Sequence, residues 1–157
     1  MRPGRLSKEQ ALQKLRHYCA YQERCHQEAR EKLFGFGLRG EEVDELISKL
    51  IEDNYLDEER FAVQFAGGKF RMKQWGRRKI EAELKARQVS TYCIRKGLAQ
   101  IQADDYQKTL SRLAEDKYNA LSTEEPFVAR AKTMSYLLQK GYEPDLASAA
   151  IDNLAKP

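Results

Sequence analysis

Proline and glycine are scarce in this chain. Its 157 residues contain four prolines and nine glycines, which are too few to supply the turns of a sandwich of short β-strands. The sequence is instead dominated by Leu, Ala, Glu, Lys, Arg and Gln, whose side chains lose little rotamer freedom in a helix. The composition therefore predicts an all-α fold.

Long apolar runs are absent, and cysteine is rare. No apolar stretch approaches the roughly 20 residues that cross a bilayer, and the charged segment 1–8 lacks the apolar part of a secretion signal. Cysteine occurs three times, at Cys19, Cys25 and Cys93. We interpret these as small apolar or half-exposed thiols in a reducing compartment, not as a disulfide framework. We therefore expect a cytoplasmic protein without membrane contact.

Motifs for nucleotide use or covalent catalysis are also missing. The sequence has no G-x-x-x-x-G-K-[ST] phosphate loop, and its glycine-containing segment 35–40 continues into Glu41, whose charge would repel a phosphate. It has no G-x-S-x-G motif, and His17 and His26 do not combine with a nucleophile and an orienting group. The cysteine and histidine spacings do not match a metal site. We expect no enzymatic activity, no cofactor and no metal.

A spaced set of apolar residues recurs along the chain. The first set is Leu33, Leu38, Val43, Ile47 and Leu50. A shift of 51 residues gives Leu84, Val89, Ile94, Leu98 and Ile101, and a further shift of 53 gives Leu137, Tyr142, Ala147, Ile151 and Leu154. At an apolar fraction of 41%, ten such matches arise by chance on the order of once in ten thousand. The sequence therefore contains a tandem repeat of about fifty residues.

Each repeat is predicted to form a long helix followed by a pair joined by a tight turn. The predicted helices span 7–22, 24–36, 41–53, 57–73, 77–87, 90–101, 104–121, 124–139 and 144–155. Capping boxes are expected at Ser7–Gln10 and Ser122–Glu125. The repeats are expected at 1–56, 57–101 and 102–157, and together they predict an elongated, curved array of three three-helix units.

Three glycines fall inside predicted helices. Gly67 and Gly68 lie in the helix 57–73, and Gly97 lies in the helix 90–101. Each costs about 1 kcal/mol relative to alanine. A kink at Gly67–Gly68 and close packing of a neighbouring helix are both compatible with this pattern.

Charge is strongly segregated. Residues 41–59 contain nine acidic residues and one basic residue, whereas residues 69–96 contain ten basic residues and two acidic ones. A basic face attracts polyanions or an acidic protein surface. The candidate binding residues are therefore Lys69, Arg71, Lys73, Trp75, Arg77, Arg78, Lys79, Lys85, Arg87, Arg95 and Lys96.

Aromatic residues accompany the basic segment. Phe70 and Trp75 could stack on an exposed base or anchor a protein contact, but they could equally belong to the core. For Trp75, which precedes a glycine at a helix junction, burial between helices is the preferred interpretation. Phe61 and Phe65 are expected to face inward, and Lys69 and Lys73 are expected to share one helix face.

Two strings in the middle of the chain resemble the RecX family. They are YLDEERFA at Tyr55–Ala62 and WGRRKI at Trp75–Ile80, followed by Glu83 and Leu84. Upstream, Arg24, Ala29, Lys32, Leu33 and Val43 resemble the first repeat of the same family. The likeness covers residues 12–89, and the last repeat agrees in pattern and length. One departure is Gln88, which stands where many relatives have glycine.

The resemblance implies a regulator of the RecA recombinase, acting in DNA repair, recombination and the SOS response. Such a protein would bind the RecA filament on single-stranded DNA and limit its growth, ATP hydrolysis and strand exchange. It would be a monomer that binds single-stranded DNA only weakly by itself. The residues alone leave two other functions open: a general helical nucleic-acid-binding module, and a helical scaffold with an acidic partner.

Overall fold

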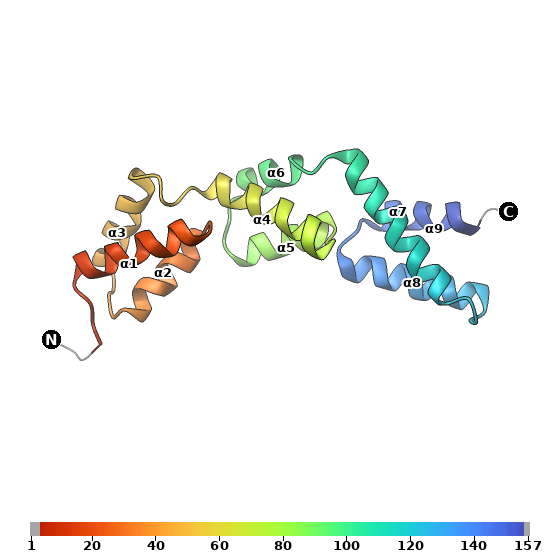
Figure 1. Ribbon diagram of the computed structural model, residues 1–157, viewed down its shortest axis with the longest axis horizontal. Helices are drawn as coiled ribbons and strands as arrows, with labels where there is room; N and C mark the ends of the chain where they lie inside the picture. The colour runs from red at the N-terminus through yellow and green to blue at the C-terminus, as the bar shows by residue number, and fades with distance from the viewer. Residues whose placement is uncertain (1–3, 156–157) are drawn as a thin grey trace.

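In the computed structural model, which describes residues 4–155, the chain forms nine helices and no strand (Figure 1). The helices are α1 (Lys8–Tyr21), α2 (His26–Gly35), α3 (Glu41–Glu52), α4 (Glu58–Lys73), α5 (Arg77–Ala86), α6 (Thr91–Ala99), α7 (Ala103–Ala120), α8 (Pro126–Lys140) and α9 (Pro144–Ala155). None of these helices is long and apolar enough to cross a membrane. The predicted all-α fold is confirmed.

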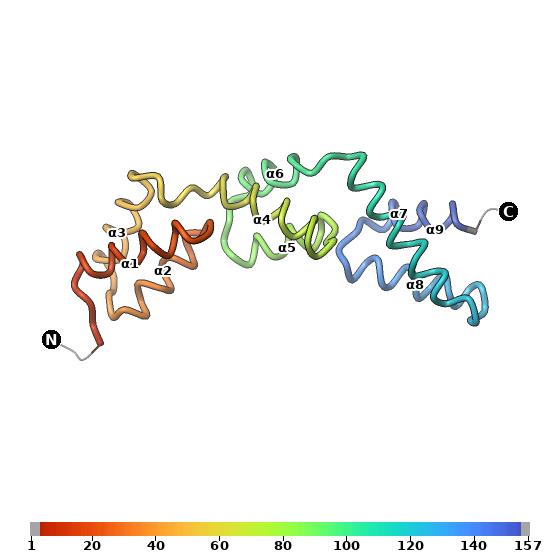
Figure 2. Tube along the Cα trace, viewed as in Figure 1, coloured from red at the N-terminus to blue at the C-terminus, as the bar shows by residue number. Residues whose placement is uncertain are grey.

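The helices follow one another in three groups of three. We call α1–α3 the first unit, α4–α6 the middle unit and α7–α9 the last unit. Figures 1 and 2 show these units side by side in chain order, in an elongated and gently curved array whose two ends carry the two termini. The predicted array of three-helix repeats is confirmed.

Polar side chains begin several of the helices. The expected capping box at Ser7 is formed: the Gln10 N–H donates to Ser7 Oγ at 3.2 Å, and the Ser7 N–H donates to Gln10 Oε1 at 3.0 Å. Asp57 caps α4 by accepting the Arg60 N–H at 2.8 Å. Ser90 accepts the N–H of the third residue of α6 in the same way. These caps explain why the predicted starts of α1, α4 and α6 lie within one residue of the observed ones.

The expected capping box at Ser122 is wrong. α8 begins at Pro126, its N-cap is Glu125, and no side-chain hydrogen bond caps it. Proline at the first helical position has a backbone already set for the helix and has no N–H to satisfy. The helix α8 therefore begins with Pro126 at its first position and has no serine cap.

The same turn ends the second helix of every unit. The N–H of one residue donates to the carbonyl of the residue five positions earlier, at 3.1–3.2 Å, as in a Schellman motif. The donor and acceptor residues are Leu38 and Leu33, Val89 and Leu84, and Tyr142 and Leu137. The residue before each donor has a positive φ: 90° at Gly37, 61° at Gln88 and 102° at Gly141. Gln88 thus adopts the left-handed backbone without being a glycine.

The buried side chains form two cores. One belongs to the first unit and includes Leu15, Leu33 and Leu50. The other runs without interruption through the middle and last units, from Phe61 and Leu84 to Tyr106, Leu110, Leu137 and Tyr142. Cys25, at the start of α2, is the residue of the first unit that joins this second core. The middle and last units therefore share one hydrophobic core.

Of the helix glycines, Gly97 provides the close approach. A Cβ at Gly97 would lie 2.6 Å from the carbonyl oxygen of Ala62, so α6 needs glycine there to cross α4. α4 continues through Gly67 and Gly68 without a break. Around Gly67, the nearest atoms belong to the Arg71 side chain of the same helix. A Cβ at Gly68 would meet nothing within 4 Å, so close packing of a neighbouring helix does not explain Gly68, whereas it does explain Gly97.

The three cysteines are buried and unbridged. Burial raises the pKa of the Cys19 and Cys25 thiols to about 11. They therefore act as small apolar groups, as predicted.

Candidate functional site

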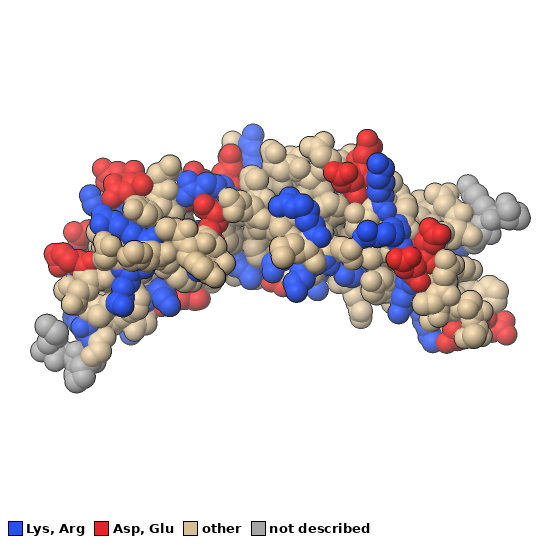
Figure 3. Space-filling model, viewed as in Figure 1, with Lys and Arg blue, Asp and Glu red and all other residues tan. Residues whose placement is uncertain are grey.

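The positive charge of the protein is concentrated in the middle unit. Residues 57–101 contain eleven Lys and Arg against five Asp and Glu, a net charge of +6. Residues 1–56 contain ten of each, and residues 102–157 contain seven basic and nine acidic residues. Figure 3 shows the same distribution: Lys and Arg gather on the lower middle of the visible face, whereas both signs mix over the two ends.

The acidic segment 41–59 does not form an equally strong negative surface. Four of its carboxylates lie within 4.0 Å of basic groups that come from the first unit. The pairs are Glu42 with Arg5, Asp44 with Arg30, Glu45 with Lys8, and Asp53 with Arg16. Basic groups of the first unit therefore neutralise four of the nine acidic residues in this segment.

The candidate cations of the middle unit fall into two groups. Arg77, Lys85 and Arg87 are paired with Glu143, Glu81 and Glu83, at 2.8, 3.0 and 3.1 Å. For the others, the described part of the chain places no carboxylate within 4.0 Å: Lys69, Arg71, Lys73, Arg78, Lys79, Arg95 and Lys96. Within the described residues, no carboxylate therefore neutralises the charges of the second group.

Trp75 lies beside two of the unpaired lysines. The Nζ atoms of Lys69 and Lys79 are 5.1 and 4.7 Å from the centroid of its ring. The ring is half-buried and contacts Phe65 edge-on, at a centroid distance of 6.4 Å. Trp75 therefore packs between helices, as preferred from the sequence, and holds two ammonium groups by cation–π contact. Phe70 is buried in the core.

Three further candidates, Arg71, Arg95 and Lys96, lie away from the surface around Trp75. The Arg71 side chain lies along Gly67 and borders a pocket shared with α7. Arg95 and Lys96 are exposed on α6, which lies above α4 in Figure 1, whereas α5 lies below it. The eleven predicted residues therefore do not make one patch. Because these residues come from three helices that present different faces, linear charge density cannot separate them.

Lys140 belongs to the same surface but was missed by the sequence analysis. Its Nζ donates to the carbonyl oxygen of Lys73 at 2.9 Å. Burial, followed by the charges of Lys79 and Lys73, lowers its pKa below the usual 10.5. Lys140 lies at the end of α8 in the last unit, where the local charge is mixed. No pattern in the sequence signals that α8 ends against the middle unit.

Arg77 joins the middle unit to the last unit. Its guanidinium is 2.8 Å from Glu143 and 3.8 Å from the centroid of the Tyr106 ring. The Tyr106 hydroxyl accepts the Arg77 N–H at 2.9 Å and donates to Glu143. Burial acts to raise the pKa of Glu143, but these hydrogen bonds outweigh it and lower the pKa. The Arg77 side chain is therefore engaged inside the protein.

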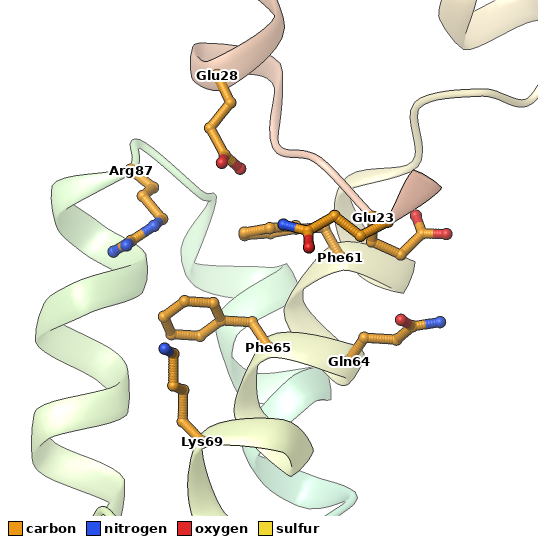
Figure 4. Close-up of a pocket in the computed structure, with 8 residues that line it drawn as sticks. Glu23, Glu28, Phe61, Gln64, Phe65, Lys69 and Arg87 are labelled. Atoms are coloured by element: carbon orange, nitrogen blue, oxygen red, sulfur yellow. The ribbon is translucent and has the colours of Figure 1, made fainter. Parts of the chain in front are cut away.

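A pocket of about 290 Å³ separates the first and middle units. Figure 4 shows Glu28 of the first unit facing Arg87 and Lys69 of the middle unit across it, with Phe61 and Phe65 along its side. Glu28 also accepts the N–H of Cys25 at 3.0 Å, which caps α2. Because groups of both signs line this pocket, its charge is balanced.

Two stretches of the chain match domains of a known family. Residues 57–98 match the domain described as RecX, second three-helix domain, and residues 104–151 match RecX, third three-helix domain. Together these stretches make up more than half of the chain.

Curated relatives carry the same family name. The regulatory protein RecX of Clostridium perfringens is 31% identical over 133 residues, covering 83% of this chain and 62% of the relative. That of Lactobacillus johnsonii is 27% identical over 144 residues, covering 92% of this chain and 53% of the relative. The chain thus spans between about half and two thirds of the length of these relatives.

Solved structures show the same fold. The crystal structure of RecX from Lactobacillus salivarius matches with a TM-score of 0.84 at 20% identity, over 94% of this chain and 96% of that one. A second crystal structure, of a regulatory protein RecX, matches with a TM-score of 0.83 at 18% identity, over 92% of this chain and 71% of that one.

Proposed function

The chain belongs to the RecX family, and from this premise we propose that it regulates RecA-type recombinase filaments. It binds the filament on single-stranded DNA and limits ATP hydrolysis and strand exchange. The regulatory name of the relatives supports this proposal. The partners are the recombinase filament and single-stranded DNA, which the chain holds weakly when it is alone. It acts in the cytoplasm, as a monomer, in DNA repair and the SOS response.

The observation that carries the proposal is the set of unpaired cations on the middle unit of an elongated array. Lys69, Lys73, Lys79 and Arg78 keep their charge because the described residues offer no carboxylate within 4.0 Å of them. Such a surface neutralises DNA phosphates or meets the acidic surface of a recombinase. The flanking units lengthen the contact along a filament.

In this account the protein acts by binding and not by catalysis. Arg77, Lys85 and Arg87 support the fold of the surface, since each is already paired with a carboxylate. The unpaired cations make the external contacts. Arg95, Lys96 and Arg71, which lie on other faces, serve contacts outside the face around Trp75.

The test is the ATPase activity of a RecA-type recombinase on single-stranded DNA. The purified chain, added below the concentration of recombinase, should suppress the steady-state rate. No effect at any ratio, with DNA binding by the recombinase verified in the same buffer, would reject the proposal.

The same unpaired cations also favour a second function, namely general binding of single-stranded nucleic acid without a recombinase partner. A polyanion needs only the cations, so this function predicts tight, salt-sensitive binding by the free chain. The discriminating measurement is affinity for an oligonucleotide with and without recombinase. Affinity that is high alone and unchanged by recombinase would favour the second function.

A further inference from the structure

We propose that Lys73, Lys79 and Lys140 form a phosphate-binding site at the joint between the middle and last units. We call these residues the lysine cluster. The inference deepens the proposed function, on which it rests for the identity of the polyanion. It names the part of the cationic face that holds the backbone of single-stranded DNA.

The backbone fixes the position of the cluster. The Gly76 N–H donates to the Lys140 carbonyl at 2.8 Å, and the Arg78 N–H donates to the Gly141 carbonyl at 2.9 Å. The end of α8 is therefore seated on the start of α5. Two glycines permit this contact: a Cβ at Gly76 would lie 2.4 Å from the Gly141 carbonyl, and a Cβ at Gly141 would lie 2.4 Å from the Cβ of Lys79.

Like charges are held together at this joint. Lys140 is anchored on the carbonyl of Lys73, and the charges of Lys79 and Lys73 both act on it. Within residues 4–155, no carboxylate lies within 4.0 Å of any of the three. Such an arrangement costs free energy in the empty protein, and an anion that enters it removes the cost.

The repeat provides an internal comparison. Shifting Lys79 back by 51 residues gives Glu28, and shifting Lys140 back by 53 gives Arg87. At the joint between the first and middle units, these equivalents have opposite charges and face each other across the pocket in Figure 4. The joint between the first and middle units thus balances its own charge, whereas the joint between the middle and last units has an excess of positive charge that an anionic ligand would neutralise. The lysine cluster is therefore not a general consequence of the repeat.

The second comparison concerns the glycines. The equivalents of Gly76 and Gly141 at the first joint are Cys25 and Gln88, by the same shifts. Among the described residues, the backbone hydrogen bonds made at Gly76 and Gly141 have no counterpart at Cys25 and Gln88. The two glycines and the like-charged lysines therefore occur together, at the same joint, as expected if the joint serves to place the charges.

Phosphate is the ligand that this chemistry fits. Ammonium groups act as compact point charges that bind phosphate without requiring planar geometry. Trp75 already has the ammonium groups of Lys69 and Lys79 within 5.1 Å of its ring centroid, so its contacts within the protein are to cations. The site therefore reads the backbone of the strand and not its sequence.

Trp75 also provides the signal for the test, because it is the only tryptophan of the chain. Its fluorescence is titrated with inorganic tripolyphosphate and, separately, with an oligothymidylate. The variant is Lys140→Gln. The control is Lys132→Gln, which removes the same charge from the same helix at a lysine paired with Glu124 at 2.8 Å.

Lys140→Gln should weaken the binding of both ligands about five- to tenfold and reduce the slope of log affinity against log salt for the oligonucleotide by about one. Lys132→Gln should bind like the unsubstituted protein. Equal affinity of the two variants for tripolyphosphate would overturn the proposal.

Thermal melting separates binding from a structural role. Tripolyphosphate should raise the melting temperature of the unsubstituted protein but not that of Lys140→Gln. Without ligand at low salt, Lys140→Gln should melt no lower than the unsubstituted protein. A second variant, Lys79→Glu, recreates the charge balance of the other joint. It should stay folded and bind no tripolyphosphate, and retained binding would also overturn the proposal.

These titrations contain no recombinase, so their outcome is independent of the ATPase test. Tripolyphosphate binding without ATPase suppression would contradict the proposed function and leave the site standing. ATPase suppression that survives Lys140→Gln, with unchanged tripolyphosphate binding, would contradict the site and leave the function standing.

Discussion

Gln88 is the one residue of the three equivalent turns that adopts a left-handed backbone with a side chain attached. Its φ is 61°, where Gly37 and Gly141 have 90° and 102°. Left-handed backbone is strained for a residue with a Cβ, and glycine removes the strain. The sequence already raised this question, since Gln88 stands where glycine was expected, and the structure shows that the turn forms regardless.

We predict that Gln88→Gly stabilises the protein by about 1 kcal/mol. The measurement is the free energy of unfolding from urea denaturation. The control is Gln100→Gly, because Gln100 is also exposed at a helix end but has an ordinary φ of −77°. Gln100→Gly should show no increase in the free energy of unfolding. A decrease for Gln88→Gly would contradict the strain argument.

Glu143 gives a residue-scale prediction about pH. Its folded-state pKa lies below the ordinary 4.5, because hydrogen bonds from Tyr106 and Arg77 outweigh the effect of burial. A lowered carboxyl pKa stabilises the fold above the unfolded value and loses this effect as pH falls through the folded value. Glu143→Gln should therefore be less stable than the unsubstituted protein by about 2 kcal/mol at pH 7.

The difference in unfolding free energy between Glu143→Gln and the unsubstituted protein should narrow as pH falls below 4.5. Unfolding free energies across the acid range check this sign. Glu115→Gln is the control, since Glu115 is exposed and the described residues place no basic group within 4.0 Å of it. A gap between Glu143→Gln and the parent that stays constant down to pH 3 would contradict the role assigned to the carboxylate.

At the scale of the element, Gly97 and Gly68 distinguish two roles of helix glycine. A Cβ at Gly97 would meet the Ala62 carbonyl oxygen at 2.6 Å, whereas a Cβ at Gly68 would meet nothing within 4 Å. Gly97→Ala should lose about 2–3 kcal/mol, because α6 must move away from α4. Gly68→Ala should gain about 0.5–1 kcal/mol through helix propensity. Urea denaturation should show a lower free energy of unfolding for Gly97→Ala and a higher one for Gly68→Ala. Changes in the same direction would contradict these two roles.

The helices themselves were largely predictable from the sequence, because their signals are local. Apolar spacing located their buried faces, and Ser7 and Asp57 located their starts. The Ser122 capping box failed because Pro126 competes for the same helix start. Gly97 was noticed, but its role depends on Ala62 in another helix, and no local pattern reports such a contact.

The candidate site was predictable only in part, for the same reason. The sequence located the charge but not its partners. Arg77 pairs with Glu143, 66 residues away, and Lys140 joins the surface from the last unit. These contacts depend on how the units dock. Charge counted along the chain therefore overstated the acidity of the first unit and missed one member of the lysine cluster.

At the scale of the whole molecule, the two cores predict two bodies. Leu15 is fully buried in the core of the first unit, and Leu110 is fully buried in the core shared by the other two units. Leu→Ala at such sites costs about 2–5 kcal/mol. Leu15→Ala should speed amide hydrogen exchange in α1–α3 and leave α4–α9 unchanged.

Leu110→Ala should speed exchange in both the middle and the last unit, although Leu110 belongs to α7. Hydrogen exchange followed by mass spectrometry resolves the three units. Faster exchange confined to α7–α9 would show that the middle and last units do not share one core.

The central claim is that the outward cations of the middle of the array, with Lys140, act on a recombinase filament. The most direct measurement is the ATPase rate of a RecA-type recombinase on single-stranded DNA, titrated with two triple variants. One replaces Lys73, Lys79 and Lys140 by glutamine. The other replaces Lys49, Lys85 and Lys132 by glutamine. These three lysines are paired with carboxylates, and their substitution removes the same total charge.

The unsubstituted protein and the second variant should suppress the rate at substoichiometric ratios. The first variant should require at least about tenfold more protein, since three phosphate contacts are lost. Equal suppression by the two triple variants, or no suppression by the unsubstituted protein, would contradict the account.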